Sequence, residues 1–375
     1  MGVERAMKLS TILLWIALLC PVLSFNANAE PLGRNYFGVH IHRPDQDRGW
    51  PDIPFGSWRL WDTYVTWSDL EPEEGRWEFL RLDRYVRAAN QIGVDLLLPL
   101  ANTPRWAASR PDEPSGYRPG NASFPREMAK WRRYVRTVAG RYRGKIRYYE
   151  IWNEPNIYHH YSGTVEQLVQ LACEARQVLR EVDPQAILVS PAASSGKRGH
   201  VEYLNSFLRL GGAACVDVIA HHFYVPDASM IELKAMVKAV RRVMRDNGVE
   251  AMPLWNTESG LWLSDKSDQK VAPYLRSGGW KRIDSEADGA RLVLASLLVA
   301  RSEGVDRFFW YSWDHRGGLG ILDAENGQQK AAADGWRRAY SAMLGATSVL
   351  CDVSVRRTRC VVKYVASPDY VLDLE

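Results

Sequence analysis

The stretch Tyr148-Tyr-Glu-Ile-Trp-Asn-Glu-Pro-Asn156 begins like a β-strand and stops being one within a few residues. The aromatic and β-branched residues of its first half suit a buried strand. Pro155 has no N–H to offer a sheet ladder, so the strand must end before it. A second apolar stretch, Pro253-Leu-Trp-Asn-Thr-Glu-Ser-Gly260, also runs into a glutamate. Two carboxylates, Glu154 and Glu258, therefore stand at the exits of apolar strands.

The rest of the chain alternates between short apolar segments and longer amphipathic ones. Eight segments have the length and composition of strands: residues 36–41, 56–61, 94–100, 147–152, 186–190, 216–223, 252–256 and 307–313. Six segments have apolar residues three and four apart, as helices do: residues 81–92, 126–143, 165–182, 200–209, 229–247 and 287–303. This alternation predicts an α/β fold, a (β/α)8 TIM barrel. The alternative, a doubly wound open sheet, usually has a Gly-rich phosphate turn after the first strand, and Val39-His-Ile-His-Arg-Pro44 has no glycine.

The pattern changes near residue 346. Residues 349–355, 359–365 and 370–374 alternate like strands and have no helices between them. We therefore expect a barrel over residues 30–345 and a short C-terminal β extension over residues 346–375, which is too small to fold alone.

The N-terminus has the features of a secretory signal peptide. Arg5 and Lys8 precede a nearly unbroken apolar run, which ends at the small-residue cleavage site Ala27-Asn28-Ala29. No basic stop-transfer cluster follows, so a permanent membrane anchor is the weaker interpretation. We expect residues 1–29 to be removed and the protein to be exported to the periplasm or the extracellular space, without stable membrane insertion.

Charge and aromatic content narrow the class of ligand. The formal charge is +4, and both signs are interspersed without long runs, which argues against nucleic-acid binding. Tryptophan is unusually frequent, with 15 residues. Its large apolar ring with a polar edge suits the flat faces of sugars, although an aromatic core would use the same residues.

Four cysteines follow the predicted cleavage site, and an even number permits disulfides in an oxidising compartment. Cys351 and Cys360 flank a predicted hairpin, so we expect them to form a disulfide. Cys173 and Cys215 could pair or remain buried and free.

Most of the candidate functional residues lie at the ends of the predicted strands. In a TIM barrel these ends form the active site. The polar residues found there are His40, His42, Arg59, Asn102, Asn153, Glu154, His221, His222, Tyr224, Glu258 and Asp314, together with Trp313. The fourth and seventh strands place Glu154 and Glu258 across the mouth from each other. That arrangement suits cleavage of a glycosidic bond, in which one carboxyl protonates the leaving oxygen and the other meets the anomeric carbon.

The neighbouring residues suggest a division of roles. Arg59, His222 and Tyr224 can point hydrogen-bond donors at Glu258 and keep it ionised. We expect Glu154, with fewer cationic neighbours in the sequence, to have the raised pKa of an acid. Asn153 can bind a sugar hydroxyl, and Trp313 can lie beneath the sugar ring. We also include His42 among the substrate-binding candidates.

At these residues the sequence resembles glycoside hydrolase clan A. The matching stretches are Trp58-Arg-Leu-Trp61, Trp152-Asn-Glu-Pro155, His222-Phe-Tyr224 and Thr257-Glu-Ser-Gly260. Within the clan it is most similar to family 39 and to the family-39-like exopolysaccharide (Psl-type) endoglycosidases, over residues 36–345. The resemblance implies a retaining mechanism with Glu154 as acid/base and Glu258 as nucleophile. It also implies a β-linked poly- or oligosaccharide cut at internal bonds.

Two other classes of protein remain as alternatives. His40 and His42 resemble the start of the metal site in amidohydrolase barrels, which His222 and Asp314 would complete. The bridging lysine and the histidine of such a site are missing from the fourth and fifth strands. A non-catalytic glycan-binding barrel is the other alternative, and the presence of both glutamates disfavours it. We expect no metal, no cofactor and a monomer, while the identity of the sugar depends on loops whose conformation the sequence does not reveal.

Overall fold

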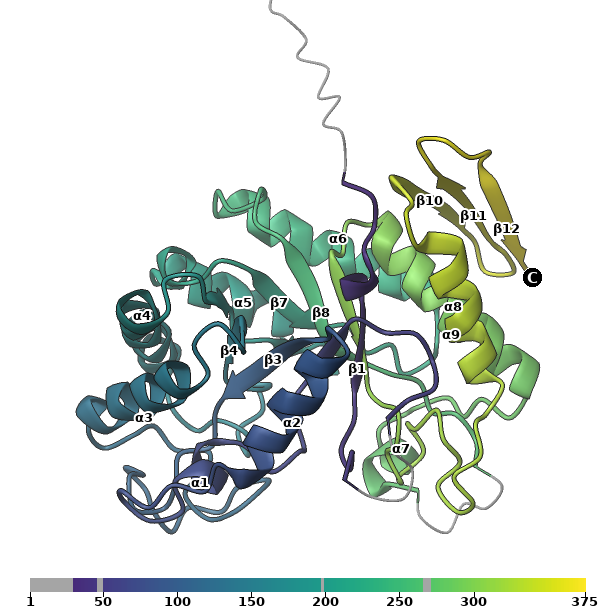
Figure 1. The fold of residues 1–375 in the computed structure, drawn as a ribbon. Helices are drawn as coiled ribbons and strands as arrows, with labels where there is room; N and C mark the ends of the chain where they lie inside the picture. The colour runs from purple at the N-terminus through teal and green to yellow at the C-terminus, as the bar shows by residue number, and fades with distance from the viewer. Residues whose placement is uncertain (1–29, 46–49, 197–198, 266–270) are drawn as a thin grey trace, which may run out of the picture.

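The computed structural model describes residues 30–45, 50–196, 199–265 and 271–375. The predicted signal peptide, residues 1–29, lies outside the described residues. The fold is the predicted TIM barrel with an additional three-stranded sheet near the C-terminus (Figure 1).

Nine parallel strands form the barrel wall, in the order β5-β4-β3-β2-β1-β9-β8-β7-β6. They are β1 (Phe37–His40), β2 (Ser57–Arg59), β3 (Asp95–Leu100), β4 (Tyr148–Ile151), β5 (Ile187–Val189), β6 (Ala193–Ser194), β7 (Ile219–His222), β8 (Leu254–Ser259) and β9 (Arg307–Trp310). β5 and β6 are two parts of one barrel strand, interrupted around Pro191, which has no N–H for the ladder. Backbone hydrogen bonds from Asp217 to Leu188 (2.8 Å) and from Ser190 to Val218 (2.9 Å) close the barrel.

Helices cover the outside of the barrel (Figure 1). They are α1 (Trp67–Leu70), α2 (Leu80–Gln91), α3 (Met128–Arg141), α4 (Val165–Val182), α5 (His200–Arg209), α6 (Met230–Asp246), α7 (Pro273–Ser277), α8 (Glu286–Ser302) and α9 (Ala332–Met343), with 3-10 turns at Arg34–Tyr36 and Gly212–Cys215. The start of α4 shows why these segments fold locally, because Thr164 and Gln167 form a reciprocal capping box. The sequence predicted six of these helices and missed α1, α7 and α9.

The interior of the barrel is a packed core rather than a channel. One apolar cluster fills it: Leu97, Tyr148, Val189, Ala192, Val218, Ala220, Trp255 and Phe309. At the N-terminal end of the strands, the guanidinium of Arg307 lies 4.3 Å from the ring centroid of Tyr148 and 4.5 Å from that of Trp255. Glu150 is two residues beyond Tyr148 and so points inward one layer closer to the mouth. The Glu150 side chain therefore begins a polar layer, which lies between the apolar cluster and the mouth of the barrel.

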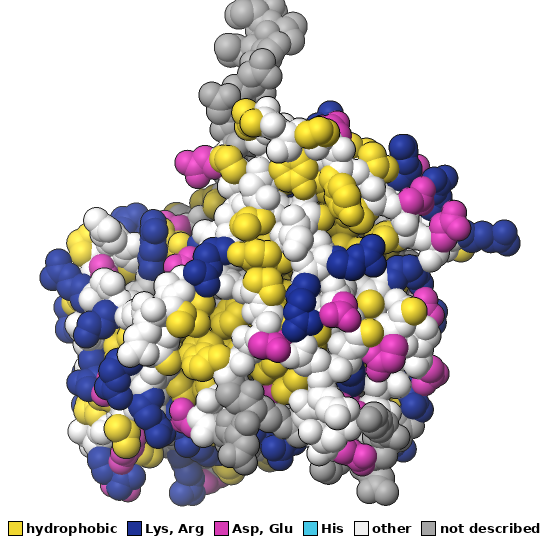
Figure 2. All heavy atoms as spheres, turned by 45° about the vertical axis from the view of Figure 1, so that its right-hand side comes forward, with side chains coloured by type: hydrophobic (Ala, Val, Ile, Leu, Met, Phe, Trp, Pro, Cys, Tyr) yellow, Lys and Arg dark blue, Asp and Glu magenta, His cyan; other side chains and the backbone are white. Residues whose placement is uncertain are grey.

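The C-terminal residues form an antiparallel sheet of β10 (Ser348–Val353), β11 (Thr358–Lys363) and β12 (Tyr370–Leu374), as predicted. The sheet contacts the barrel helices, since Cys351 N–H donates to Ser302 Oγ on α8 (2.8 Å) and Lys234 Nζ on α6 donates to Cys351 O (3.0 Å). Figure 2 shows this side of the molecule, where Lys and Arg side chains are mixed with Asp and Glu and no face of a single charge stands out.

The described part of the chain contains two disulfides. Cys351 and Cys360 are bonded across β10 and β11, as expected from the sequence. Cys173 on α4 is bonded to Cys215 in the turn before β7, which settles the open choice for this pair. Within the described residues, none of the helices has both the length and the apolar character needed to span a bilayer.

Candidate active site

Glu154 and Glu258 meet at the C-terminal mouth of the barrel. An oxygen of each carboxylate lies within 4.8 Å of the other and of a His222 ring nitrogen. Both side chains are nearly buried, with residue exposures of 8% for Glu154 and 6% for Glu258. The two strand exits that the sequence singled out therefore open into one shared site.

The backbone explains why the strand before Glu154 stops. Trp152 and Glu154 have left-handed φ angles of 61° and 44°, which non-glycine residues rarely adopt. Such a conformation costs about 1–3 kcal/mol per residue and persists where the surrounding structure enforces it. Here the Glu154 N–H donates to Ala192 O (3.1 Å), next to the interruption between β5 and β6. The turn directs the carboxylate into the mouth instead of along the barrel wall.

Arg59, on β2, connects the residues of the site. Its Nη1 donates to Glu258 Oε2 (2.8 Å), its Nε to Glu150 Oε2 (2.7 Å) and its Nη2 to Asn153 Oδ1 (2.7 Å). The side chain is fully buried, so these charge-assisted bonds form without competition from solvent. Arg59 orients Glu258 as expected, and it fixes Asn153 so that the amide nitrogen is the group left for a ligand.

Glu150 is a site residue that the sequence analysis missed. It is fully buried within β4 and is the second carboxylate bound by Arg59. The signal was a charged residue in an otherwise apolar strand, at an inward position two residues from Tyr148. A buried carboxylate needs a partner, and Arg59 is that partner.

Tyr224 and His222 serve different glutamates. Tyr224 Oη donates to Glu258 Oε1 (2.9 Å), as predicted. His222 was expected to hold Glu258, but its Nδ1 lies 3.1 Å from Glu154 Oε1 and 4.0 Å from Glu258 Oε1. The strand register does not account for this, since it aligns His222 with Glu258 across β7 and β8, and the difference lies in the direction of the ring.

His160 is a second contact of Glu154 that the sequence did not indicate. Its Nδ1 lies 3.3 Å from Glu154 Oε2, and its backbone oxygen accepts a hydrogen bond from Trp152 Nε1 (2.8 Å). His160 lies six positions after Glu154 in a loop, so neither helical nor strand periodicity relates the two residues.

The pKa values of the two carboxyls reflect these neighbours. Burial raises the pKa of Glu154, but the rings of His160 and His222 outweigh it and hold the pKa well below its usual range. Burial, with the charge of Glu154, raises the pKa of Glu258 against the opposing effects of His222 and Arg59. The expectation of a raised pKa at Glu154 is therefore wrong for the free protein, because the rings of His160 and His222 lie against its carboxylate, and the local sequence revealed neither contact.

The remaining candidates lie around this centre. Trp313 is only 2% exposed, and its indole nitrogen has no hydrogen-bond partner within the described chain. His42 lies with Asp314, whose carboxylate accepts the backbone N–H groups of His42 (2.8 Å) and Arg43 (2.9 Å). His40 Nε2 contacts the backbone oxygen of Thr257 (3.0 Å).

The geometry does not favour the amidohydrolase alternative. Over the described ranges, the group of three potential metal ligands is Glu154, His222 and Glu258, and it contains none of His40, His42 and Asp314. Glu258 already accepts donors from Arg59 and Tyr224, and a cation placed there would face the guanidinium directly. The donor set suits a pair of reacting carboxyls better than a metal ion.

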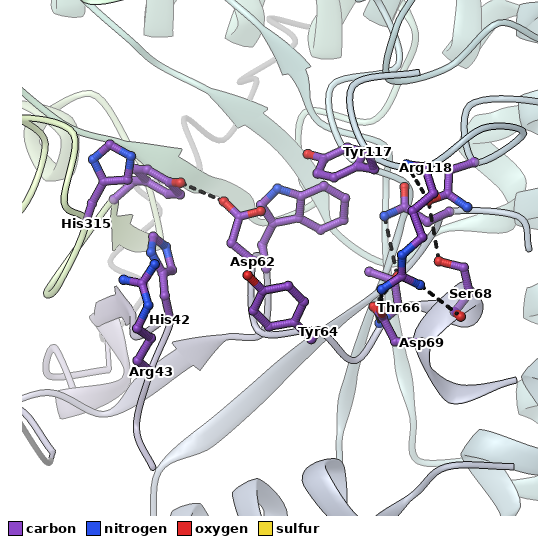
Figure 3. Close-up of a pocket in the computed structure, with 14 residues that line it drawn as sticks. His42, Arg43, Asp62, Tyr64, Thr66, Ser68, Asp69, Tyr117, Arg118 and His315 are labelled. Atoms are coloured by element: carbon purple, nitrogen blue, oxygen red, sulfur yellow. Dashed lines mark hydrogen bonds and ion pairs between the residues drawn. The ribbon is translucent and has the colours of Figure 1, made fainter. Parts of the chain in front are cut away.

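A cavity of about 400 Å³ lies beside this centre, and neither glutamate is among the residues that line it (Figure 3). Its wall comes from the loops after β1, β2, β3 and β9: His42, Arg43, Trp61, Asp62, Tyr64, Thr66, Ser68, Asp69, Asn102, Tyr117, Arg118, Asn121, Tyr311 and His315. Tyr117 joins it to the centre, since its ring lies 5.7 Å from that of His160. Trp262 packs beside the site, against a cluster that contains Tyr224 and Tyr311, whereas Trp106 packs on Trp67.

A TIM barrel with two carboxylates paired at its C-terminal mouth is an arrangement that glycoside hydrolases use. The chain belongs to glycosyl hydrolases family 39, whose family model matches residues 59–274. A search of curated protein sequences returned no match.

Three solved structures illustrate the likeness. A glucosidase from Croceicoccus marinus is 16% identical, with a TM-score of 0.62 over 91% of this chain and 78% of that one. A family 39 glycoside hydrolase from Bacteroides cellulosilyticus is 16% identical, with a TM-score of 0.66 over 91% and 69% of the two chains. A monomeric β-xylosidase from Caulobacter crescentus is 17% identical, with a TM-score of 0.65 over 92% and 76%. At these identities the structures establish a shared fold.

Proposed function

We propose that the protein is a retaining glycoside hydrolase in which Glu258 is the nucleophile and Glu154 the acid/base. The observation that carries the proposal is the approach of the two carboxylates, with oxygens within 4.8 Å of each other. Retaining enzymes hold their carboxyl groups about 5–5.5 Å apart, whereas inverting enzymes separate them by about 6.5–9.5 Å to admit a water molecule.

The donors around Glu258 support its assignment as the nucleophile. Arg59 and Tyr224 each donate to one of its oxygens, so the ionised carboxylate is held in a fixed orientation facing the mouth. Glu258 attacks the anomeric carbon while the bond to the leaving oxygen breaks, and a covalent glycosyl ester forms. Asn153, fixed by Arg59, offers its amide nitrogen to a sugar hydroxyl.

Glu154 supplies the proton that the leaving oxygen takes. In the free protein its carboxylate oxygens lie 3.1 Å from a ring nitrogen of His222 and 3.3 Å from one of His160. After the first product leaves, Glu154 accepts a proton from water as the water oxygen attacks the ester, which releases the sugar and restores Glu258.

The substrate we propose is a β-linked glycan, cut at internal bonds, such as a bacterial exopolysaccharide. One solved relative is described as a β-xylosidase, which supports the β linkage. Tyr64 and Tyr117 are exposed by 58% and 39% along the cavity and offer stacking surfaces beyond one sugar. Internal cleavage predicts a rapid fall in viscosity with little early monosaccharide, and the opposite order would indicate exo action.

We also propose that the protein is exported after loss of residues 1–29. The two disulfides support this, because such bonds persist mainly in oxidising compartments.

Chemical rescue tests the two roles separately. Glu258→Gly should lose turnover, and azide should restore product with the opposite anomeric configuration, because azide attacks the vacated face directly. Glu154→Ala should still cleave aryl glycosides with activated leaving groups and give azide products of retained configuration. Glycan binding by the wild-type protein without any release of reducing ends would instead establish the non-catalytic alternative.

A further inference from the structure

The cavity beside the two glutamates has an end lined by hydrogen-bond donors. His42, Arg43 and His315 gather there, while Asp69 and Arg118 lie at the opposite end and Asp62 lies between them (Figure 3). Neither the family assignment nor the proposed chemistry gives these residues a role.

Arg43 is the unusual member of this group. Its Nη1 is buried and has no hydrogen-bond partner within the described parts of the chain. The nearby Asp314 accepts the backbone N–H groups of His42 and Arg43, and within the described residues it forms no ion pair with the Arg43 guanidinium. A buried guanidinium donor left without an acceptor is unfavourable, so a ligand that supplies one would be bound strongly.

His315 and His42 add donors of the same kind. His315 Nδ1 accepts the backbone N–H of Gly317 (3.1 Å), which leaves the proton on Nε2. His42 Nε2 is buried and unpartnered in the described structure. Both carboxylates of the cavity are partly engaged, because Asp69 pairs with Arg118 (2.8 Å) and one oxygen of Asp62 accepts from Tyr311 Oη (2.6 Å), while Asn102 Oδ1 is buried without a partner in the described structure.

The middle of the cavity suits a sugar ring. Trp61 and Tyr117 meet edge to face, with ring centroids 5.4 Å apart, and Tyr64 is exposed beside them. The volume falls within the range of about 300–1,000 Å³ that small-molecule sites occupy. The site also adjoins the reacting centre, since the Arg59 guanidinium lies 5.7 Å from the Trp61 ring.

We propose that this cavity binds a sugar unit that carries a carboxylate, next to the unit that reacts, and that Arg43 selects for it. Arginine offers a planar fork that matches a carboxylate with two parallel hydrogen bonds. The ring stacks among Trp61, Tyr64 and Tyr117, and the free oxygen of Asp62 receives a sugar hydroxyl. The inference rests on the proposed glycosidase function and adds to it a preference for acidic glycans.

The test compares matched glycans that differ in the carboxylate. The probes are β-linked polysaccharides containing glucuronate, galacturonate or mannuronate, each with its carboxyl-reduced counterpart. Affinity electrophoresis in gels containing these polysaccharides measures binding, with Glu154→Gln as the background variant so that turnover is suppressed. We expect at least one acidic form to retard the protein more than its reduced counterpart does.

Variants then connect the preference to Arg43. Arg43→Gln should weaken retardation by the acidic form about 10- to 100-fold and leave the reduced form unaffected, as expected for a hydrogen-bonded charge. Arg43→Lys should bind the acidic form more weakly than the background variant and more strongly than Arg43→Gln. Lysine keeps the positive charge but cannot form two parallel hydrogen bonds with a carboxylate. Arg87→Gln, on the exposed face of α2, is the matched control and should behave like the background variant.

Three results would overturn the inference: equal retardation by acidic and reduced forms, an acidic preference that survives Arg43→Gln, or no retardation by any acidic glycan. Failure of the glycosidase proposal is distinguishable from these, because it requires that the wild-type protein release reducing ends from neither acidic nor neutral glycans.

Discussion

Arg59 is the residue through which the site is connected. It is fully buried and donates to Glu258, Glu150 and Asn153. Removing one member of a buried charge network leaves the others unpaired, which costs about 3–5 kcal/mol. Arg59→Met should therefore lower the free energy of unfolding by that amount and abolish turnover.

A double variant separates the structural cost from the catalytic one. Arg59→Met with Glu150→Leu removes the buried carboxylate that the single variant leaves without a partner, so it should recover part of the lost stability. Turnover should not return, because Glu258 still lacks its donor. Urea unfolding and an aryl-glycoside assay measure the two effects, and a single variant with wild-type stability and rate would contradict this role.

His160 should affect the pH profile. It lowers the pKa of Glu154, so its removal should raise that pKa and let the acid keep its proton to higher pH. Because Glu154 has the lower pKa of the pair, its titration sets the acid limb of kcat/KM, so His160→Asn is expected to move the acid limb to higher pH and raise the maximum, while the alkaline limb, which follows Glu258, stays in place. An acid limb at its original pH would show that the ring has only a packing role against Tyr117.

At the scale of elements, the sequence predicted most strands and helices because their patterns are local. α4 and α5 have the predicted bounds, and β12 does as well. α9 was missed because alanines give a weak apolar pattern and Gly335 lies inside the helix. The structure explains this glycine, since a Cβ there would lie 2.0 Å from the backbone oxygen of Ala290 on α8.

The candidate site was predicted less completely than the fold. Glu154, Glu258, Arg59 and Tyr224 lie together where the strand order of a barrel places them. The sequence could not reveal that His160 contacts Glu154 or that His222 turns toward it. The first contact depends on a loop conformation and the second on the direction of a side chain, and neither has a local sequence pattern.

The two disulfides should stabilise the folded protein to different extents. The Cys173–Cys215 bond closes 42 residues and the Cys351–Cys360 bond only 9. Loop-closure entropy predicts a stabilisation of about 4 kcal/mol for the longer loop and about 2.5 kcal/mol for the shorter one. Urea unfolding of the two double Cys→Ser variants should show this order, with aryl-glycoside turnover retained at low denaturant. The reverse order would mean that the C-terminal sheet contributes more to barrel stability than its loop length implies.

At the scale of the whole molecule, the barrel supports the reacting groups in layers. The apolar cluster and Arg307 fill the base, and the Arg59–Glu150 pair forms a polar layer above them. Glu154 and Glu258 then project from opposite walls on this rigid support. The short distance between them follows from the fold as a whole, so the stereochemistry of the reaction tests the entire arrangement.

The most direct test is the anomeric configuration of the first product, followed by proton NMR during hydrolysis by the wild-type protein. Because the carboxylate oxygens lie within 4.8 Å of each other, we predict two displacements and a first product with the configuration of the substrate. Mutarotation should then bring in the other anomer slowly. If the opposite anomer appears first, the enzyme inverts, a water molecule attacks in place of Glu258, and the assignment of Glu258 as nucleophile is wrong.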